Sequence, residues 1–343
     1  MTSGVRWWRA VVLMAATLAG CGRAPGAMTF GGWVTEDPDS TVQLKSNAGL
    51  LDSVSLFYYG IDTGGGVRRV VKAEDAGTIA WARKRGILVY ATIGGTPPLL
   101  PAAIAGKAGE RCVKELVALC ERFGYDGVDV DFEAMGPGGR DPYTLFVAKL
   151  ASALSVMKRP RRLSVTVMDV PSARDEASTA FDYAALGRLA DHVRVMYYDY
   201  SYDKPGPLMP RGYFAEELAY ARSRIPAEKF VAALPWYGRD WVPATGAHED
   251  LVWTQREKET GLAGPAELME QYGVAPEWRE PEGELTFSYT RDGRRHEVWM
   301  PDSRKFAWMV AEVRKAGASG IYVWHLAHAS TAHWQSVRDL VRR

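Results

Sequence analysis

Short runs of apolar residues alternate along this chain with longer stretches in which apolar residues recur at helical spacing. The short runs are typical of β-strands and the longer stretches of amphipathic helices. The predicted strands occupy residues 30–34, 54–61, 87–93, 127–133, 163–170, 193–198, 230–237 and 320–324. Strands that alternate with helices predict a parallel sheet, and eight such units predict an α/β fold, a closed (β/α)8 TIM barrel.

The helices between these strands end at residues that break helices, as in the predicted helices 73–84 and 213–225. A third predicted helix contains Cys112 and Cys120 on its apolar face and stops at Gly124. Eight helical positions separate two residues by ~12 Å, which is beyond the reach of a disulfide. We therefore expect both cysteines to be buried packing residues.

Residues 242–300, between the seventh strand and its helix, follow no single period and contain many Gly, Pro, charged and aromatic residues. They predict a small inserted α+β subdomain. Within it, residues 287–289 and 296–299 flank an Asp292-Gly293 pair, which is typical of a β-hairpin. We expect one enzyme domain over residues 28–343, interrupted by this insertion.

The amino terminus is predicted to lie outside that domain. Two arginines precede an apolar run at residues 10–19, which is too short to span a bilayer and predicts an export signal over residues 1–20. The Leu-Ala-Gly-Cys at residues 18–21 resembles the lipobox of bacterial lipoproteins, which implies cleavage before Cys21 and lipid attachment to it. Residues 21–27 are small and polar, as in a tether. We expect an exported protein, anchored through Cys21 to a bacterial membrane and facing the periplasm or cell surface.

The composition of the chain argues against nucleic acid as a partner. The 343 residues are 47% hydrophobic and 24% charged, with a formal net charge of +1. This balance describes a globular protein without the basic surface that nucleic acid requires, so no nucleic-acid partner is expected. His325 and His328 lie three residues apart, but no further ligand can be named, so neither a metal nor a cofactor is implied. We expect the protein to act as a monomer.

Residues 126–133 read Asp-Gly-Val-Asp-Val-Asp-Phe-Glu, with acids at every second position. In a strand, Asp129, Asp131 and Glu133 share one face. A solvated strand face also alternates polar and apolar residues, but three like charges in a row repel one another. Barrel enzymes take their catalytic groups from the C-terminal strand ends, which places Glu133 at the mouth and the two aspartates progressively deeper.

Burial and neighbouring carboxylates both favour the protonated acid, so the pKa of at least one group is expected to be raised. Glu133 is placed to deliver a proton to a leaving group. Asp131 can alternate between sharing a proton with Asp129 and turning toward the substrate. This arrangement indicates general acid/base catalysis.

Residues 126–133 resemble the catalytic motif of glycoside hydrolase family 18, with all four acidic positions filled. Further motifs of that family are matched in chain order: Thr-Ile-Gly-Gly at 92–95, Met-Tyr-Tyr-Asp at 196–199, Leu-Pro-Trp-Tyr-Gly-Arg at 234–239, and Gly-Ile-Tyr-Val-Trp at 320–324. The resemblance covers nearly the whole chain after the export signal.

The resemblance implies substrate-assisted catalysis with retention of anomeric configuration. Glu133 protonates the glycosidic oxygen, Asp131 stabilises the substrate's 2-acetamido group as it attacks the anomeric carbon, and Asp129 tunes Asp131. Tyr198 would hydrogen-bond the acetamido carbonyl. The expected substrate-binding residues are Asp126, Met196, Asp199, Trp236, Tyr237, Arg239, Trp241 and Trp324, with Trp324 forming the floor under the cleaved sugar. For Asp126, a cap or brace of the turn at Gly127 is an equal alternative.

The segment 296–303 is similar to an element of the branch that contains chitobiases and spore-cortex or cell-wall N-acetylglucosaminidases. In the seventh-strand motif at 234–239, Arg239 stands where a tyrosine is usual. We therefore expect β-1,4-linked N-acetylglucosamine oligomers or peptidoglycan strands as the substrate. Two other hypotheses stay open. A catalytically silent lectin would keep the sugar site without turnover, and a metal-dependent barrel enzyme would use the acids as ligands and lose activity in EDTA.

Overall fold

The computed structural model describes residues 28–72, 75–95, 99–251 and 264–341. The predicted export signal, the tether and Cys21 lie outside the described residues. The described helices include none that is both long and apolar enough to cross a membrane.

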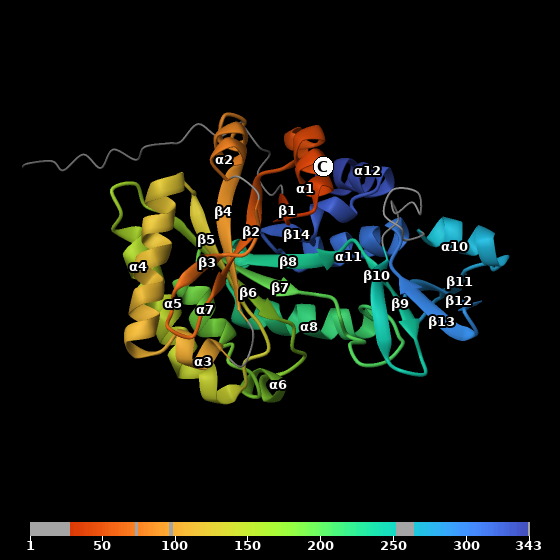
Figure 1. Ribbon diagram of the computed structural model, residues 1–343. Helices are drawn as coiled ribbons and strands as arrows, with labels where there is room; N and C mark the ends of the chain where they lie inside the picture. Colours follow the sequence, from red (N-terminus) through yellow and green to blue (C-terminus); the bar gives the residue numbers. More distant parts are fainter. Residues whose placement is uncertain (1–27, 73–74, 96–98, 252–263, 342–343) are drawn as a thin grey trace, which may run out of the picture.

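Eight parallel strands form a closed barrel in the middle of the molecule (Figure 1). The first strand pairs with the last and with the second, which closes the ring. Every strand predicted for the barrel is present, with bounds that differ by a few residues at most. The strands are β1 (Thr29–Val34), β2 (Ser53–Ile61), β4 (Leu88–Gly95), β5 (Gly127–Phe132), β6 (Arg162–Met168), β7 (His192–Met196), β8 (Phe230–Pro235) and β14 (Gly320–Trp324). A short β3 (Val67–Arg69) runs antiparallel to β2.

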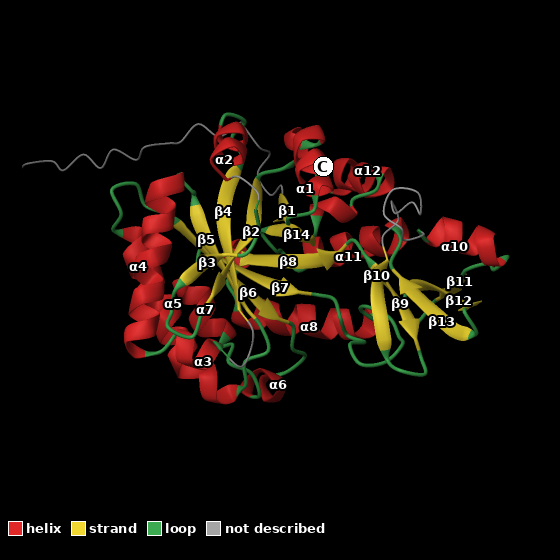
Figure 2. Cartoon of the chain, viewed as in Figure 1, coloured by secondary structure: helices red, strands yellow, loops and turns green. Residues whose placement is uncertain are grey.

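Helices follow the strands and surround the barrel (Figure 2). They are α1 (Pro38–Ser46), α2 (Asp75–Arg83), α3 (Leu100–Ala103), α4 (Gly106–Phe123), α5 (Arg140–Ser155), α6 (Ala173–Ala177), α7 (Tyr183–Leu189), α8 (Arg211–Arg224), α11 (Ser303–Lys315) and α12 (Thr331–Leu340). Helix α4 shows why the sequence pattern predicted them. It buries Cys112 and Cys120 as free thiols, and it ends where Gly124 adopts a left-handed conformation.

The insertion forms a second, antiparallel sheet beside the barrel, with the strand order β10-β9-β13-β12-β11 (Figure 1). Its elements are β9 (Gly238–Val242), β10 (Ala247–Leu251), α10 (Pro265–Tyr272), β11 (Glu277–Arg279), β12 (Glu284–Arg291) and β13 (Arg294–Met300). Asp292 and Gly293 both have positive φ, as a two-residue type I′ hairpin turn requires. This sheet begins at Gly238, earlier than the predicted boundary at residue 242, because β9 leaves the barrel to pair with β13.

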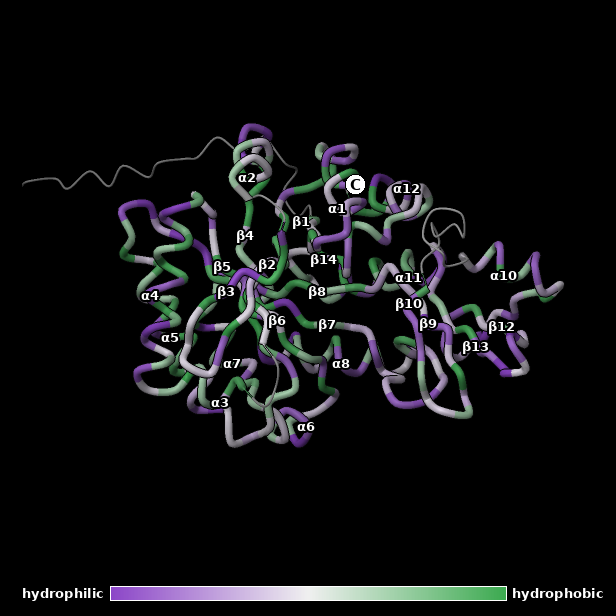
Figure 3. The backbone as a smooth tube through the Cα atoms, viewed as in Figure 1, coloured by the Kyte–Doolittle hydropathy of each residue, from purple (hydrophilic) through white to green (hydrophobic). Residues whose placement is uncertain are grey.

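Apolar residues gather in two places in the barrel. The larger core lies between the strands and the helices, and in Figure 3 the helical tubes accordingly alternate between apolar and polar colours. A smaller cluster fills the barrel interior and consists of Trp33, Met196, Val231, Ala233 and Tyr322, with Phe57, Tyr198 and Trp324 packed against it. The candidate site is built on this inner cluster.

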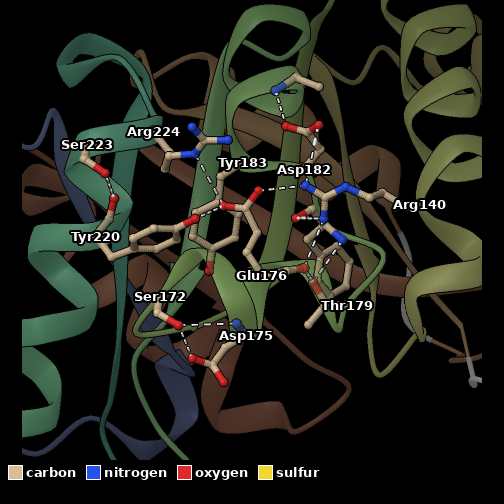
Figure 4. Close-up of polar contacts among 12 residues, drawn as sticks. Arg140, Ser172, Asp175, Glu176, Thr179, Asp182, Tyr183, Tyr220, Ser223 and Arg224 are labelled. Atoms are coloured by element: carbon tan, nitrogen blue, oxygen red, sulfur yellow. Dashed lines mark hydrogen bonds and ion pairs between the residues drawn. The ribbon is translucent and has the colours of Figure 1, made fainter.

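The loop that follows β5 is tied to its neighbour by a buried carboxylate, Glu176 of α6 (Figure 4). Arg140, the first residue of α5, donates to Glu176 at 2.8 Å, and the Tyr220 hydroxyl donates to it at 2.6 Å. The backbone of the two loops also joins directly, because the Ala180 amide donates to the Met135 carbonyl at 3.0 Å. These contacts hold in place the segment that begins just after Glu133.

We expect Glu176→Gln to lower the free energy of unfolding by about 2 kcal/mol, because a buried charge-assisted pair with Arg140 is lost. Urea denaturation measures this change. Asp182→Asn is the matched control: its carboxylate lies 3.5 Å from the same guanidinium but is about one-third exposed, so an effect of about 0.5 kcal/mol or less is expected. Equal effects of the two changes would contradict the role of burial.

Candidate active site

The row of acids on β5 lies as predicted. Val128, Val130 and Phe132 are fully buried in the outer core, so the alternate residues face the barrel interior. Asp129 is completely buried, Asp131 is 3% exposed, and Glu133 follows the end of the strand with its side chain open to solvent. The three acids therefore run from the barrel interior to its mouth.

Hydrogen bonds surround the deepest acid, Asp129. Its Oδ2 accepts from Trp33 Nε1 and from Thr92 Oγ1, each at 3.0 Å, and its Oδ1 accepts from Thr166 Oγ1 at 3.1 Å. Arg194 Nη1 lies 2.8 Å from Oδ2. The strands β1, β4, β6 and β7 each supply one of these partners, so the surroundings of Asp129 are assembled from four other strands of the barrel.

The two acids nearer the mouth, Asp131 and Glu133, both have raised pKa values. Burial, then the charges of Glu133 and Asp129, raise the pKa of Asp131 well above its usual range, against a smaller opposite effect of Arg194. Glu133 is exposed on one side, yet protein atoms crowd its carboxyl, and this desolvation together with Asp199 raises its pKa. Asp131 Oδ1 is buried and accepts no hydrogen bond within the described ranges.

Tyr198 and Asp199 follow β7 at the same mouth. Burial raises the pKa of Tyr198, which keeps its phenol protonated and able to donate near neutral pH. Asp199 has a positive φ of 64°, and its Oδ1 lies 2.6 Å from Arg239 Nη2 and accepts from the Tyr237 hydroxyl at 2.5 Å. Tyr237 and Arg239, both nearly buried, thus hold the Asp199 carboxylate.

Trp324 ends β14 and remains partly exposed above the inner cluster. Its ring packs edge-on against Trp33 at 5.6 Å and Phe57 at 5.3 Å. Met196 lies in the same cluster and is 6% exposed. The structure therefore brings together Asp129, Asp131, Glu133, Met196, Tyr198, Asp199, Tyr237, Arg239 and Trp324.

Three of the predicted substrate-binding residues do not join this group. Asp126 precedes β5, at the opposite end of the strand from Glu133, where it accepts from Arg159 Nη2 at 2.7 Å and from the Val89 amide at 3.1 Å. It braces the base of the barrel, in agreement with the alternative expectation for this residue.

The two tryptophans proposed to stack on sugars are fully buried. Trp236 faces the outer helices, where it stacks on His333 with a centroid distance of 5.1 Å. Trp241 lies in β9 of the second sheet and packs against His248. The predictions for both were wrong because strand alternation directs Trp236 outward and the second sheet covers Trp241.

Sequence reasoning missed Arg194, Thr92 and Thr166, which all contact Asp129. Arg194 had a readable signal: it stands between Val193 and Val195, so it shares the inward face of β7 with Met196. Thr92 begins the Thr-Ile-Gly-Gly motif at 92–95, which was matched without a role for the threonine. Nothing comparable marks Thr166, because threonine is common in strands.

A second carboxyl pair, the buried Glu217 and the half-buried Asp169, lies at the C-terminal end of β6. Asp169 follows β6, and Glu217 projects from α8 with no solvent exposure. Burial, and then the neighbouring Asp169 carboxyl, raise the pKa of Glu217 far above its usual range. Glu217 therefore keeps its proton near neutral pH in the folded protein.

We expect Glu217→Gln to stabilise the protein at pH 8 by about 1–2 kcal/mol. A carboxyl whose folded-state pKa is raised binds more protons folded than unfolded, so its stability contribution falls as pH rises above the unfolded value. Glutamine keeps a permanent donor toward Asp169 and removes this loss. Thermal unfolding across pH 5–9 tests the prediction, with the exposed Glu216→Gln as control. A benefit that does not grow with pH would contradict it.

Within the parts of the chain that the structure describes, no group of three or more His, Cys, Asp or Glu residues is arranged to hold a metal ion. Of the acids in the β5 row, Asp129 contacts three hydrogen-bond donors and Arg194.

The closed barrel, with ionisable groups from several strand ends at one mouth, defines the class of this protein as a (β/α)8-barrel enzyme. The family model "Glycosyl hydrolases family 18" matches residues 30–329, and the chain belongs to that family. It is thus a glycoside hydrolase.

Relatives agree with this assignment. The chain is 23% identical over 330 residues to the uncharacterized glycosylase YvbX of Bacillus subtilis, and the match spans 92% of each protein. It is also similar to the crystal structure of a chitinase from Chromobacterium violaceum, with 26% identity, a TM-score of 0.82, and coverage of 92% of this chain and 100% of that one. The spore cortex-lytic enzyme SleL of Bacillus megaterium shares the fold at 21% identity and a TM-score of 0.78, with 93% and 76% of the two chains covered.

Proposed function

We propose that this protein is a retaining hydrolase of β-1,4-linked N-acetylglucosamine glycans that uses the substrate's own acetamido group as nucleophile. One observation carries the proposal: the buried Asp131 carboxyl lies between Asp129 and Glu133 in the row that ends at the mouth, and its Oδ1 accepts no hydrogen bond in the described structure. It offers an acceptor for the N–H of an acetamido group, beneath the acid that would protonate the leaving oxygen.

The proposed reaction has two steps. Glu133 gives its proton to the glycosidic oxygen while the acetamido oxygen attacks the anomeric carbon, so the glycosidic bond breaks and an oxazolinium ion forms. The Asp131 carboxylate stabilises the positive charge on that ion. Water then attacks the anomeric carbon, its proton returns to Glu133, and the acetamido group is restored with net retention.

The residues around the acids support a sugar in this position. Tyr198 can donate its protonated hydroxyl to the acetamido carbonyl. Asp199 is held by Tyr237 and Arg239 and presents its remaining acceptors at the mouth. The partly exposed ring of Trp324 offers an apolar face of the kind on which sugar rings stack.

The substrate class is tested by product analysis. Purified protein is incubated with chitooligosaccharides and, separately, with purified peptidoglycan, and the products are identified by mass spectrometry and by NMR of the new anomeric centre. We expect release of N-acetylglucosamine-containing fragments with the β configuration retained. An inverted product would exclude the acetamido mechanism, and sugar binding without any product would favour a lectin.

We further propose export and lipid anchoring at Cys21, on the sequence pattern of residues 1–21 alone. Mass spectrometry of the protein from its native host is expected to find Cys21 lipidated and residues 1–20 removed. An intact amino terminus would overturn this proposal.

A further inference from the structure

An arginine is buried in the barrel interior directly beside the acids. Arg194 of β7 is 2% exposed, and its Nη1 lies 2.8 Å from Asp129 Oδ2 and donates to Ser55 Oγ at 2.7 Å. Its guanidinium lies over the ring of Tyr322, with 3.6 Å to the ring centroid. The Tyr322 hydroxyl donates to the same Ser55 oxygen at 3.0 Å. Contacts from three strands therefore fix the position of this charge.

These contacts decide which acid can take up a proton. An ionised carboxylate has about four acceptor positions. Asp129 accepts three hydrogen bonds, from Trp33, Thr92 and Thr166, and it forms an ion pair with Arg194. A proton on Asp129 would remove the charge that pairs with Arg194 and would leave this guanidinium, which is 2% exposed, buried without that counterion.

Asp131, two residues along the same face, is in the opposite situation. Its Oδ1 is buried and without a hydrogen bond in the described chain, so a proton there displaces nothing. Glu133 is open to solvent and to any ligand at the mouth. The contrast between the acids follows from the donors that surround each one.

We propose that Arg194 is a positioning residue: it holds Asp129 as a permanent anion and confines the mobile proton to the two carboxyls nearer the mouth. The inference rests on the proposed function, because it assigns the proton that the proposed mechanism uses. It also revises the expectation that Asp131 shares its proton with Asp129.

The other titratable groups around Arg194 and Asp129 do not hold Asp129 as an anion. Burial raises the pKa of Tyr90, Tyr143 and Tyr322, which keeps them neutral, and burial lowers the pKa of His192 to about 4, which keeps it neutral near pH 7. Arg162 begins β6 and Asp191 precedes β7, so these opposite charges lie at the base of the barrel. Arg194 is thus the cation that contacts the acid row from within.

The pH dependence of kcat/KM tests the proposal with an N-acetylglucosamine oligosaccharide as substrate. Arg194 lowers the pKa of Asp131, so without the guanidinium Asp131 takes up a proton more readily. We therefore expect Arg194→Met to move the acid limb of the profile upward by about 1–3 pH units. Arg194→Lys, which retains the positive charge, is expected to leave the limb close to its wild-type position. Lower activity in Arg194→Met with an unmoved acid limb would show a merely structural role and overturn the proposal.

A second measurement needs neither turnover nor a folded variant. Neutron diffraction from crystals of the deuterated wild-type protein near pH 6 is expected to place a deuteron on the carboxyls of Asp131 or Glu133 and none on Asp129. A deuteron on Asp129 would overturn the proposal. If the wild-type protein cleaves no N-acetylated glycan, the proposed function fails, while the neutron map still decides the role of Arg194.

Discussion

Glu133→Gln is expected to lower kcat by about 10³–10⁴-fold on N-acetylglucosamine oligosaccharides, at the upper end of what a general acid contributes. Glutamine keeps the size and polarity of the side chain but has no proton to give to the glycosidic oxygen. Because the residue stands at the end of β5 and is open to solvent, its exchange leaves the buried packing unchanged. Steady-state kinetics give kcat, and isothermal titration calorimetry gives the affinity for the oligosaccharide, which we expect to persist.

The matched control is Glu110→Gln on α4, an exposed glutamate whose carboxylate lies 3.4 Å from Lys149 Nζ. It makes the same chemical change on the outer surface of the barrel, so activity is expected to match that of the wild type. Undiminished hydrolysis by Glu133→Gln, with the control also active, would remove Glu133 from the mechanism.

Asp131→Asn is expected to lower kcat by roughly 10²–10³-fold with a small change in KM, because the lost charge acts mainly on the oxazolinium ion as it forms. Asparagine retains an acceptor for the acetamido N–H but cannot balance the positive charge of the intermediate. The burial of the wild-type carboxyl strengthens this charge effect. Initial rates over a range of substrate concentrations separate kcat from KM.

Asp141→Asn, an exposed substitution in the first turn of α5, is the control for the same change of side chain.

A second experiment uses oligosaccharides with free amines in place of acetamido groups, which the wild-type enzyme is expected to leave intact. Cleavage of the deacetylated sugar at the normal rate would contradict the substrate-assisted mechanism, whatever the effect of Asp131→Asn.

The fold was predictable because it depends on local patterns. Each barrel strand is an apolar run bounded by turn residues, and α4 ends at the glycine that the sequence marks. The hairpin around Asp292-Gly293 was also predictable, because the turn needs two residues that accept positive φ. The start of the second sheet was placed too late, since the pairing of Arg239 with Trp299 joins positions sixty residues apart.

The candidate site was predictable in part. Strand alternation put Asp129, Asp131 and Glu133 on one face, and the structure confirms this. It could not tell which aromatic residues would be covered, and Trp236 and Trp241 proved to be buried packing residues. Whether a side chain is buried depends on which other elements pack over it. The sequence of a single strand does not predict those contacts.

The sequence by itself determined the closed barrel and the order of acids along β5, because strand period and strand ends are local properties of the chain. Only the tertiary structure decided what each acid contacts. Thr92 and Thr166 lie on the two strands that pair with β5, and Arg194 lies one strand farther along the sheet. The electrostatic character of the acids depends on these partners from other strands and on burial, and both arise only when the strands assemble.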